Sequence, residues 1–227
     1  MIERLNKFVI IGVLYSAHPE LTIASINYLS ILMFPIFLGL TWKKDTGPVV
    51  LPMINIGLSI VEMNLTYRYS NISYAYSSLF QMTYEIIFLL IVHDVYFYYA
   101  HLLCHVNPFL YRNVHKPHHK LYNKSWRGAF YMHPLEAILV VAPSVALGIY
   151  ILSQFIPVSA STCIVWMNMA IFDFMWTHGN TSAGWAPALE EHAIHHNLFN
   201  YNYSSKWIDV LHGTYLDPKD VKNAGAK

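Results

Sequence analysis

The stretch His101-Leu-Leu-Cys-His105 organises the chain, and His115-Lys-Pro-His118-His119 follows it ten residues later. A third box, His192-Ala-Ile-His195-His196, lies near the C-terminus. The three boxes hold eight of the 13 histidines in the 227-residue chain. Residues three and four apart share one face of an α-helix, so each box can direct two or three imidazoles towards one point. Imidazole is a common ligand of transition metals, and eight convergent ligands are too many for one ion and enough for two.

The composition indicates a membrane protein. Hydrophobic residues make up 55% of the chain and charged residues only 12%, against about 25% charged residues in average chains. The mean hydropathy is +0.34, and the net charge of +1 gives no reason to expect a nucleic-acid partner. Two cysteines, Cys104 and Cys163, are too few for a disulfide framework. We expect no removable signal peptide, because the first apolar run breaks at His18-Pro19 without a small-residue cleavage pattern.

Apolar stretches that approach the length needed to cross a bilayer, about 20 residues, alternate with polar segments. A short run at 8–15 is expected at the membrane interface. The candidate spans are 21–42, 48–65, 79–103, 136–157 and 160–177. The sequence therefore predicts an all-α integral membrane helical bundle of about four to five spans in hairpins, with a histidine-rich helical cap.

The distribution of charge predicts the sidedness of that cap. Between residues 104 and 135 there are five basic residues and no acidic one: Arg112, Lys116, Lys120, Lys124 and Arg127. Cytoplasmic segments next to spans are enriched in such residues, so we expect this segment to be cytoplasmic. The hairpin 136–177 leaves this side and returns to it, which would bring the third box to the face that holds the first two.

Several polar residues near the boxes need separate assignments. Asp94 lies seven residues before His101, on the same helical face, where it could accept a hydrogen bond from a ligand imidazole. A helix contact of another kind explains Asp94 equally well. His93 lies about 100° away from Asp94 around the helix, His133 precedes a proline at a helix entry, and His212 lies far from any box spacing, so these three are not expected to be ligands.

Two other kinds of metal site do not fit the spacing. A zinc-protease helix needs a glutamate directly after the first histidine of an i, i+4 pair, and this chain has Leu102 and Ala193 there. The carboxylate-bridged di-iron site of ferritin-like bundles needs Glu-x-x-His pairs, and the chain contains none. An all-histidine dinuclear site remains.

Beyond their spacing, the boxes resemble those of the fatty acid hydroxylase/sterol desaturase superfamily of integral-membrane di-iron oxygenases. The similarity extends over residues 94–215 and keeps the family's order. Tyr131-Met-His133-Pro134-Leu-Glu136 looks like the family's segment that enters the second hairpin. Phe199-Asn-Tyr-Asn-Tyr203-Ser and Trp207-Ile-Asp209-Val-Leu-His-Gly213-Thr214-Tyr215 look like its closing segment. Thr177-His178-Gly179-Asn180 resembles the segment that supplies one further ligand, which implies His178 as the ninth.

The resemblance implies two iron ions, dioxygen as co-substrate, and an electron donor such as cytochrome b5 or a reductase at the cytoplasmic face. It implies N-terminal membrane segments at 1–78 and a di-iron domain at 79–227, which includes the membrane hairpin 136–177. In a eukaryote the expected location is the endoplasmic reticulum membrane, with the boxes facing the cytoplasm. Catalytic residues beyond the metal ligands are not assigned, and Asp94 is a candidate partner of a ligand imidazole. The implied ligands are His101, His105, His115, His118, His119, His178, His192, His195 and His196.

The function expected from this resemblance is O2-dependent hydroxylation or desaturation of a lipid, with a sterol as the first candidate. The Phe-Asn-Tyr-Asn-Tyr and His-Gly-Asn segments lean towards the sterol 5-desaturase branch, and His-Pro-Leu-Glu towards the sterol 4-methyl oxidase branch. A fatty acyl or sphingolipid hydroxylase of the same superfamily is the alternative. A histidine-rich metal transporter is the alternative from another class, although its ligands would be expected near the bilayer midplane.

Overall fold

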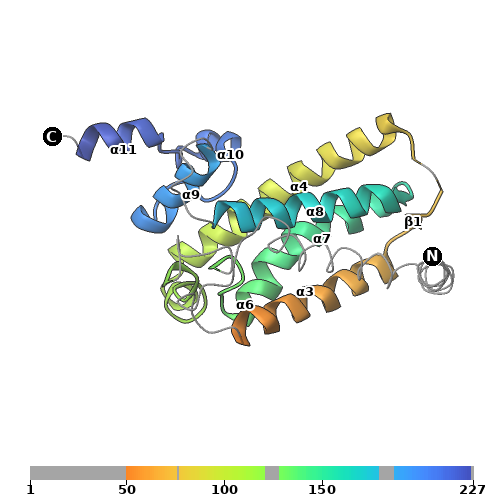
Figure 1. Ribbon diagram of the computed structural model, residues 1–227, viewed down its shortest axis with the longest axis horizontal. Coiled ribbons are helices and arrows are strands. Elements are labelled where there is room, and N and C mark those ends of the chain that lie inside the picture. Colours follow the sequence, from red (N-terminus) through yellow and green to blue (C-terminus); the bar gives the residue numbers. More distant parts are fainter. Residues whose placement is uncertain (1–49, 76, 121–127, 179–186, 226–227) are drawn as a thin grey trace, which may run out of the picture.

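Four long helices form the body of the molecule (Figure 1). The computed structural model describes residues 50–75, 77–120, 128–178 and 187–225. The four helices are α3 (Val50–Tyr69), α4 (Leu79–Val106), α7 (Ala142–Ser153) and α8 (Ala160–Thr177). A parallel pair of two-residue strands, β1 (Ile72–Ser73) and β2 (Val158–Ser159), joins the α3–α4 connection to the α7–α8 connection.

The shorter elements lie between these helices in sequence or follow them. After α4 come α5 (Pro108–Leu110), the π-helical turn η1 (Tyr111–His115) and the 3₁₀ turn η2 (His118–Lys120). The helix α6 (Pro134–Glu136) and the π-helical turn η4 (Ala137–Val141) lead into α7. The chain closes with α9 (Pro187–Leu198), α10 (Lys206–His212) and α11 (Pro218–Gly225), which gather at the end of the bundle where α4 and α8 end (Figure 1).

The predicted helices at 48–65, 79–103, 136–157 and 160–177 correspond to α3, to α4, to α6 through α7, and to α8. Two of the described helices, Leu79–Val106 and Pro134–Ser153, are long and apolar enough to cross a membrane. The predicted runs 8–15 and 21–42 lie outside the described residues. The β1–β2 pair was not predicted, because two residues per strand are too few for an alternating pattern.

The boundaries of α4 show why the first two boxes meet. Ser78 caps the helix by accepting a hydrogen bond from the N–H of Gln81 at 3.1 Å. At the other end Asn107 accepts from the N–H groups of Phe109 and Leu110, so a new helical turn begins directly after α4. The chain therefore reverses at the end of α4 and returns the second box to the first.

Close contact between α4 and α7 forms the centre of the bundle. A Cβ placed on Gly148 of α7 would lie 2.9 Å from Leu89 Cδ2 and 3.4 Å from Leu89 Cα. Leu89 is fully buried in the main apolar cluster, next to Ile149 and Trp166. Small residues let helix backbones approach in this way where lipid surrounds the bundle.

Replacing Gly148 with valine should therefore destabilise the protein by about 1–3 kcal/mol, because overpacking displaces Leu89 or separates the helices. Gly57 on α3 is the matched control, since a Cβ there meets nothing within 4 Å. Thermal unfolding in detergent measures both variants. Equal melting temperatures for Gly148→Val and Gly57→Val would contradict the packing argument.

A buried carboxylate joins α4 to the start of α8. Glu85 accepts hydrogen bonds from the Thr162 hydroxyl, from the Ser159 N–H at 3.3 Å and from Gln81 Nε2 at 3.0 Å. Its side chain is fully buried, so these donors supply the hydrogen bonds that water would otherwise give. Glu85 thus has a structural role in holding the N-terminus of α8.

Candidate metal centre

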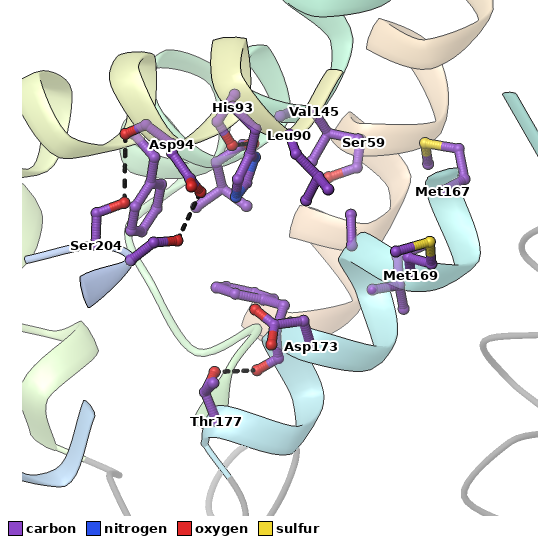
Figure 2. A pocket seen from close by; sticks show the side chains of 18 of the residues that line it. Ser59, Leu90, His93, Asp94, Val145, Met167, Met169, Asp173, Thr177 and Ser204 are labelled. Atoms are coloured by element: carbon purple, nitrogen blue, oxygen red, sulfur yellow. Dashed lines mark hydrogen bonds between the residues drawn. The ribbon is translucent and has the colours of Figure 1, made fainter. Parts of the chain in front are cut away.

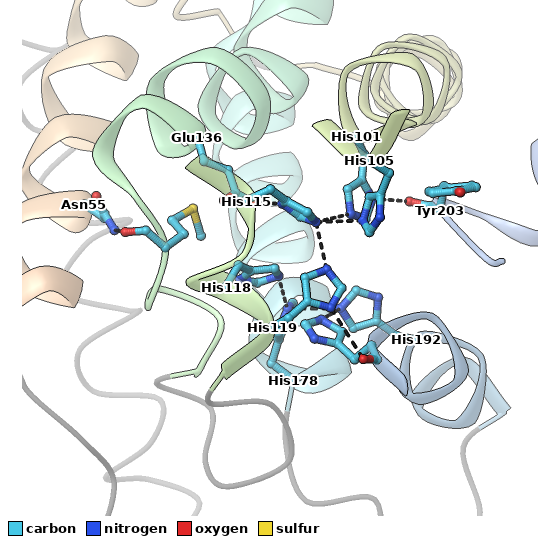
Figure 3. Close-up of polar contacts among 12 residues, drawn as sticks. Asn55, His101, His105, His115, His118, His119, Glu136, His178, His192 and Tyr203 are labelled. Atoms are coloured by element: carbon cyan, nitrogen blue, oxygen red, sulfur yellow. Dashed lines mark hydrogen bonds and ion pairs between the residues drawn. The ribbon is translucent and has the colours of Figure 1, made fainter. Parts of the chain in front are cut away.

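The nine histidines implied as ligands lie in two clusters. Figure 3 labels His101, His105, His115, His118, His119, His178 and His192 among them. Within each cluster the candidate ligand atoms lie within 4.8 Å of one another. The five-histidine cluster consists of His101, His105, His115, His119 and His195. The four-histidine cluster consists of His118, His178, His192 and His196.

The helical phase of each box determines which cluster a histidine joins. Histidines four residues apart stay together: His101 with His105, His115 with His119, and His192 with His196. The third members, His118 and His195, cross to the other cluster. Each box therefore directs two imidazoles at one point, and in the second and third boxes the third imidazole joins the other cluster. The second box is not α-helical either: it begins in the π-turn η1 and ends in the 3₁₀ turn η2.

Ring nitrogens converge inside the five-histidine cluster. His115 Nε2 lies 2.8 Å from His105 Nε2, 2.8 Å from His119 Nε2 and 3.2 Å from His101 Nε2. His195 Nε2 is buried and has no hydrogen-bond partner among the described residues.

In the four-histidine cluster, His178 Nε2 lies 3.0 Å from His118 Nε2 and 3.0 Å from His192 Nε2. His192 Nε2 in turn lies 3.0 Å from His196 Nε2. Each cluster therefore gathers imidazole nitrogens around one point, which is the arrangement a transition metal ion requires.

The outer ring nitrogens establish which atoms face the centre. His101 Nδ1 lies 2.7 Å from the carbonyl oxygen of Tyr203, and His178 Nδ1 lies 2.7 Å from that of Phe174. Because a carbonyl oxygen only accepts, these Nδ1 atoms carry the proton. His195 Nδ1 donates in the same way to the carbonyl oxygen of Tyr201 at 2.8 Å. Their Nε2 atoms therefore present lone pairs to the clusters, which a metal cation satisfies and neighbouring imidazoles do not.

Glu136 holds the central histidine of the five-histidine cluster. Its Oε1 lies 2.7 Å from His115 Nδ1, and both side chains are buried (Figure 3). Asn55 on α3 supports the segment that leads to Glu136, since its Nδ2 donates to the carbonyl oxygens of Phe130 and Met132, each at 2.9 Å. A carboxylate on the outer nitrogen orients a ligand imidazole and raises its basicity. Sequence reasoning had assigned no role to Glu136, although it lies two residues after the His133-Pro134 helix entry.

Two further residues shape the closing segment 199–205. Asp209 accepts from the N–H groups of Tyr203 and Ser204 at 2.9 and 2.8 Å. Asn202 adopts a left-handed backbone conformation, with φ of 56°, and its side chain bonds to the backbone of Glu191 and Leu216. Both residues thereby fix the backbone that offers carbonyl oxygens to His195 and His101. Sequence reasoning quoted this motif without these roles.

Asp94 does not accept from a ligand imidazole. Its two carboxylate oxygens accept from the Ser205 hydroxyl at 2.7 Å and from Trp207 Nε1 at 2.6 Å. The expected hydrogen bond to a ligand histidine is therefore absent within the part of the chain that the structure describes. The hydrogen bonds from Ser205 and Trp207 instead hold the start of α10 against Asp94 of α4. Asp94 reaches His101 only through the closing segment, whose Tyr203 carbonyl oxygen accepts from His101.

The histidines that were kept out of the ligand set lie outside both clusters. His133 caps α6 by accepting from the N–H of Leu135 at 3.1 Å. His212 bonds to Tyr99 and to the carbonyl oxygen of Ile208. His93 packs against Phe97 and Trp166.

Comparison with known families identifies this arrangement. A family model described as fatty acid hydroxylase matches residues 86–214, more than half of the chain. The chain belongs to the fatty acid hydroxylase family. The match contains α4 from its second turn onwards and all nine clustered histidines.

The relatives that the chain matches carry different names. The chain is 28% identical over 161 residues to methylsterol monooxygenase erg25B of Aspergillus fumigatus, covering 66% of this chain and 54% of the relative. It is 31% identical over 144 residues to sphinganine C4-monooxygenase 2 of Arabidopsis thaliana, covering 58% and 54%. Fatty acid hydroxylase domain-containing protein 2 of Homo sapiens is 28% identical over 139 residues, covering 61% and 40%. The chain spans about half the length of such relatives, and no solved structure matches it.

The fatty acid hydroxylase fold encloses a cavity of about 370 Å³ next to the four-histidine cluster. Side chains from α3, α4, α7 and α8 line it, most of them apolar (Figure 2). One end reaches His178 and His192, and the wall continues through Phe174 and Trp166 towards Met63 on α3. An apolar molecule in this cavity would contact the four-histidine cluster directly.

Burial keeps the histidines of this fatty acid hydroxylase centre neutral. Burial lowers the pKa of His119 to about 4, and burial together with the His119 ring lowers the pKa of His178 to about 4. Burial and the neighbouring rings lower the pKa of His118, His192 and His195 well below the usual range. Neutral imidazole is the form that binds metals, so the clusters hold their ligands ready at neutral pH.

These pKa values predict a pH-dependent stability of the metal-free protein. The unfolded chain takes up protons on its histidines below about pH 6.5, whereas His119 and His178 in the folded chain do so only near pH 4. The unfolded state then binds more protons, so stability falls as the pH decreases from about 6.5 to about 4. Urea unfolding of chelator-treated protein between pH 7.5 and 4.5 measures this trend. A stability that is flat over this range, or rises towards pH 4.5, would contradict the pKa shifts.

Proposed function

We propose that this chain is a membrane-bound, non-haem di-iron oxidoreductase that uses O2 to hydroxylate or desaturate a lipid. The observation that supports this most is the division of nine histidines into two clusters whose inward-facing atoms are ring nitrogens. Membership of the fatty acid hydroxylase family supports the same reaction class. Two iron ions bound there would supply the activation of dioxygen and the oxidation of an unactivated C–H bond.

The residues of the chain would bind and orient the metals and exclude water. Carbonyl oxygens of Tyr203, Tyr201 and Phe174 fix ligand rings in one tautomer. Glu136 adds a carboxylate to His115, which partly balances the charge that neutral imidazoles leave uncompensated. His101, His115, His178 and His195 are each exposed by 2% or less, so bulk water has little access to these ligands.

The cavity supports a lipid as the substrate. Its apolar wall suits a hydrocarbon skeleton, and its contact with His178 and His192 would bring one carbon of that skeleton to the metals. We propose a sterol as the first candidate, in line with the names of the methylsterol monooxygenase relatives. The sphinganine C4-monooxygenase relatives support a fatty acyl or sphingolipid substrate as the alternative.

The same proposal includes the membrane placement, the domain bounds, the electron donor and the cellular location. We place α3, α4, α6–α7 and α8 in the membrane as hairpins, with the clusters at the cytoplasmic ends of α4 and α8. The proposed di-iron domain is 79–227, preceded by N-terminal membrane segments at 1–78. Electrons would come from a cytochrome b5 or a reductase, and in a eukaryotic cell the endoplasmic reticulum membrane is the proposed location.

The first test is the metal content of detergent-purified protein beside a His195→Ala/His196→Ala variant. The double variant leaves four imidazoles in the five-histidine cluster and three in the four-histidine cluster, so about two irons per chain should fall to about one or fewer. His212→Ala is the matched control, because His212 belongs to neither cluster and should keep both irons. Zinc alone, or two irons that survive the double substitution, would refute the di-iron proposal and favour a metal transporter or a structural role.

A further inference from the structure

The cavity beside the four-histidine cluster carries polar side chains deep between the helices. Glu62 on α3 and His93 on α4 line its wall among apolar residues such as Leu90 and Val145. Figure 2 shows His93 and Leu90 on one side of the cavity, with Asp173 and Thr177 of α8 on the other. Ionisable residues at such depth are costly, and their default interpretation is functional.

Two atoms on this wall lack partners. Glu62 Oε2 and His93 Nδ1 are buried, and neither has a hydrogen-bond partner among the described residues. Leaving a buried donor or acceptor unpaired costs free energy, so such atoms are rare unless a ligand completes them.

Ser59, Ser144 and Asp94 on the same wall are satisfied within the chain. The hydroxyl of Ser59 donates to the Asn55 carbonyl oxygen at 3.0 Å, and that of Ser144 donates to the Val141 carbonyl oxygen at 2.7 Å. Asp94 is occupied by Ser205 and Trp207. The unpaired atoms of Glu62 and His93 are therefore not explained by a generally polar wall.

The chemistry of the two side chains specifies what would complete them. A carboxylate accepts a hydrogen bond, and a neutral imidazole nitrogen donates or accepts according to its tautomer. A hydroxyl group both donates and accepts, so it can pair with either residue. An ionised carboxylate on the ligand would instead be repelled by an ionised Glu62.

The position of His93 on α4 relates the cavity to the five-histidine cluster. His93 precedes His101 by eight residues on α4, which is about 12 Å along the helix axis. A hydroxyl bound at His93 therefore lies about two helical turns from His101.

We propose that Glu62 and His93 form a subsite that binds a hydroxyl group of the lipid substrate. The inference rests on the proposed function for the ligand being a substrate, and on the cavity alone for the binding of the hydroxyl. It selects lipids that carry a hydroxyl group on an apolar skeleton.

The test measures binding without turnover. Cholesterol and its deoxy counterpart cholest-5-ene compete with tritium-labelled cholesterol for detergent-purified full-length protein, and hexadecan-1-ol and hexadecane are compared against labelled hexadecan-1-ol. A hydroxyl that pairs with Glu62 and His93 should improve binding about tenfold or more in at least one pair. Equal affinities within both pairs, or no specific retention of either labelled alcohol, would overturn the subsite.

Variants identify the residues responsible. Glu62→Leu/His93→Phe should bring the alcohol and its deoxy counterpart to within about twofold, while the phenylalanine ring keeps the contacts with Phe97 and Trp166. Ser59→Ala is the matched control on the same wall and should keep the preference, because the Ser59 hydroxyl is already bonded. A preference that survives in the double variant would place the hydroxyl elsewhere.

Metal analysis of the same samples separates this inference from the proposed function. Protein that prefers the alcohol but contains no iron would refute the di-iron enzyme and keep the subsite. Protein that contains iron but binds the alcohol and its deoxy counterpart equally would refute the subsite and keep the di-iron proposal. If the double variant melts before assay, the wild-type comparison of alcohol with deoxy lipid still decides the inference.

Discussion

Replacing His192 with alanine is expected to lower the bound iron from about two ions per chain to about one, since two clusters are present. The substitution leaves three imidazoles in the four-histidine cluster and removes the atom that lies 3.0 Å from both His178 Nε2 and His196 Nε2. The five-histidine cluster keeps all its members. Lipid oxidation should fall below detection, because the cavity reaches the metal centre at His178 and His192.

His105→Ala is the matched comparison for this prediction. It also removes one ring, but it leaves four imidazoles in the five-histidine cluster. We therefore expect His105→Ala to retain more iron than His192→Ala when both are loaded anaerobically with ferrous iron and analysed by elemental mass spectrometry. Identical losses, or two irons retained by His192→Ala, would show that the clusters do not bind one ion each.

Replacing Glu136 with glutamine should weaken metal binding by about 10–100-fold, the usual effect of losing a carboxylate behind a ligand imidazole. Glutamine keeps the size of the side chain but removes the charge that faces His115 Nδ1 at 2.7 Å. Competition with a graded series of chelators measures the affinity. Because His115 belongs to the five-histidine cluster, only one of the two ions should become easier to remove.

Glu85→Gln controls for the loss of a buried carboxylate in general. Glu85 bonds to Gln81, Ser159 and Thr162 and touches neither cluster. The variant should melt at a lower temperature and keep the metal affinity of the wild type. If Glu136→Gln and Glu85→Gln change the affinity equally, the role of Glu136 is structural.

The sequence predicted the four long helices of the described residues, because each corresponds to a long apolar run bounded by polar residues. The start of α4 at Leu79 and the bounds of α8 at 160–177 were predicted to the residue. The histidine set was also predictable, since the boxes and the segment around His178 are local in sequence. The helical phase within each box was not predicted. His118 and His195 join the opposite cluster because adjacent residues point about 120° apart in the 3₁₀ turn η2 and about 100° apart in α9.

Contacts between distant segments could not be read from the sequence. The Glu136–His115 pair spans 21 residues, and the His101–Tyr203 contact spans 102. The spacing of Asp94 from His101 favoured a direct contact, but Ser205 and Trp207 fold back onto Asp94 from more than 100 residues away. The helical periodicity of a sequence predicts the face on which a residue lies. It does not predict which residue from a distant segment will contact that face.

The crossing of neighbouring histidines between clusters has a mechanical consequence. His118 and His119 are joined by one peptide unit, as are His195 and His196, and each pair contributes to both clusters. The peptide links at 118–119 and 195–196 therefore couple the two clusters, and the second link lies within α9. A shift of α9 would move histidines of both clusters together.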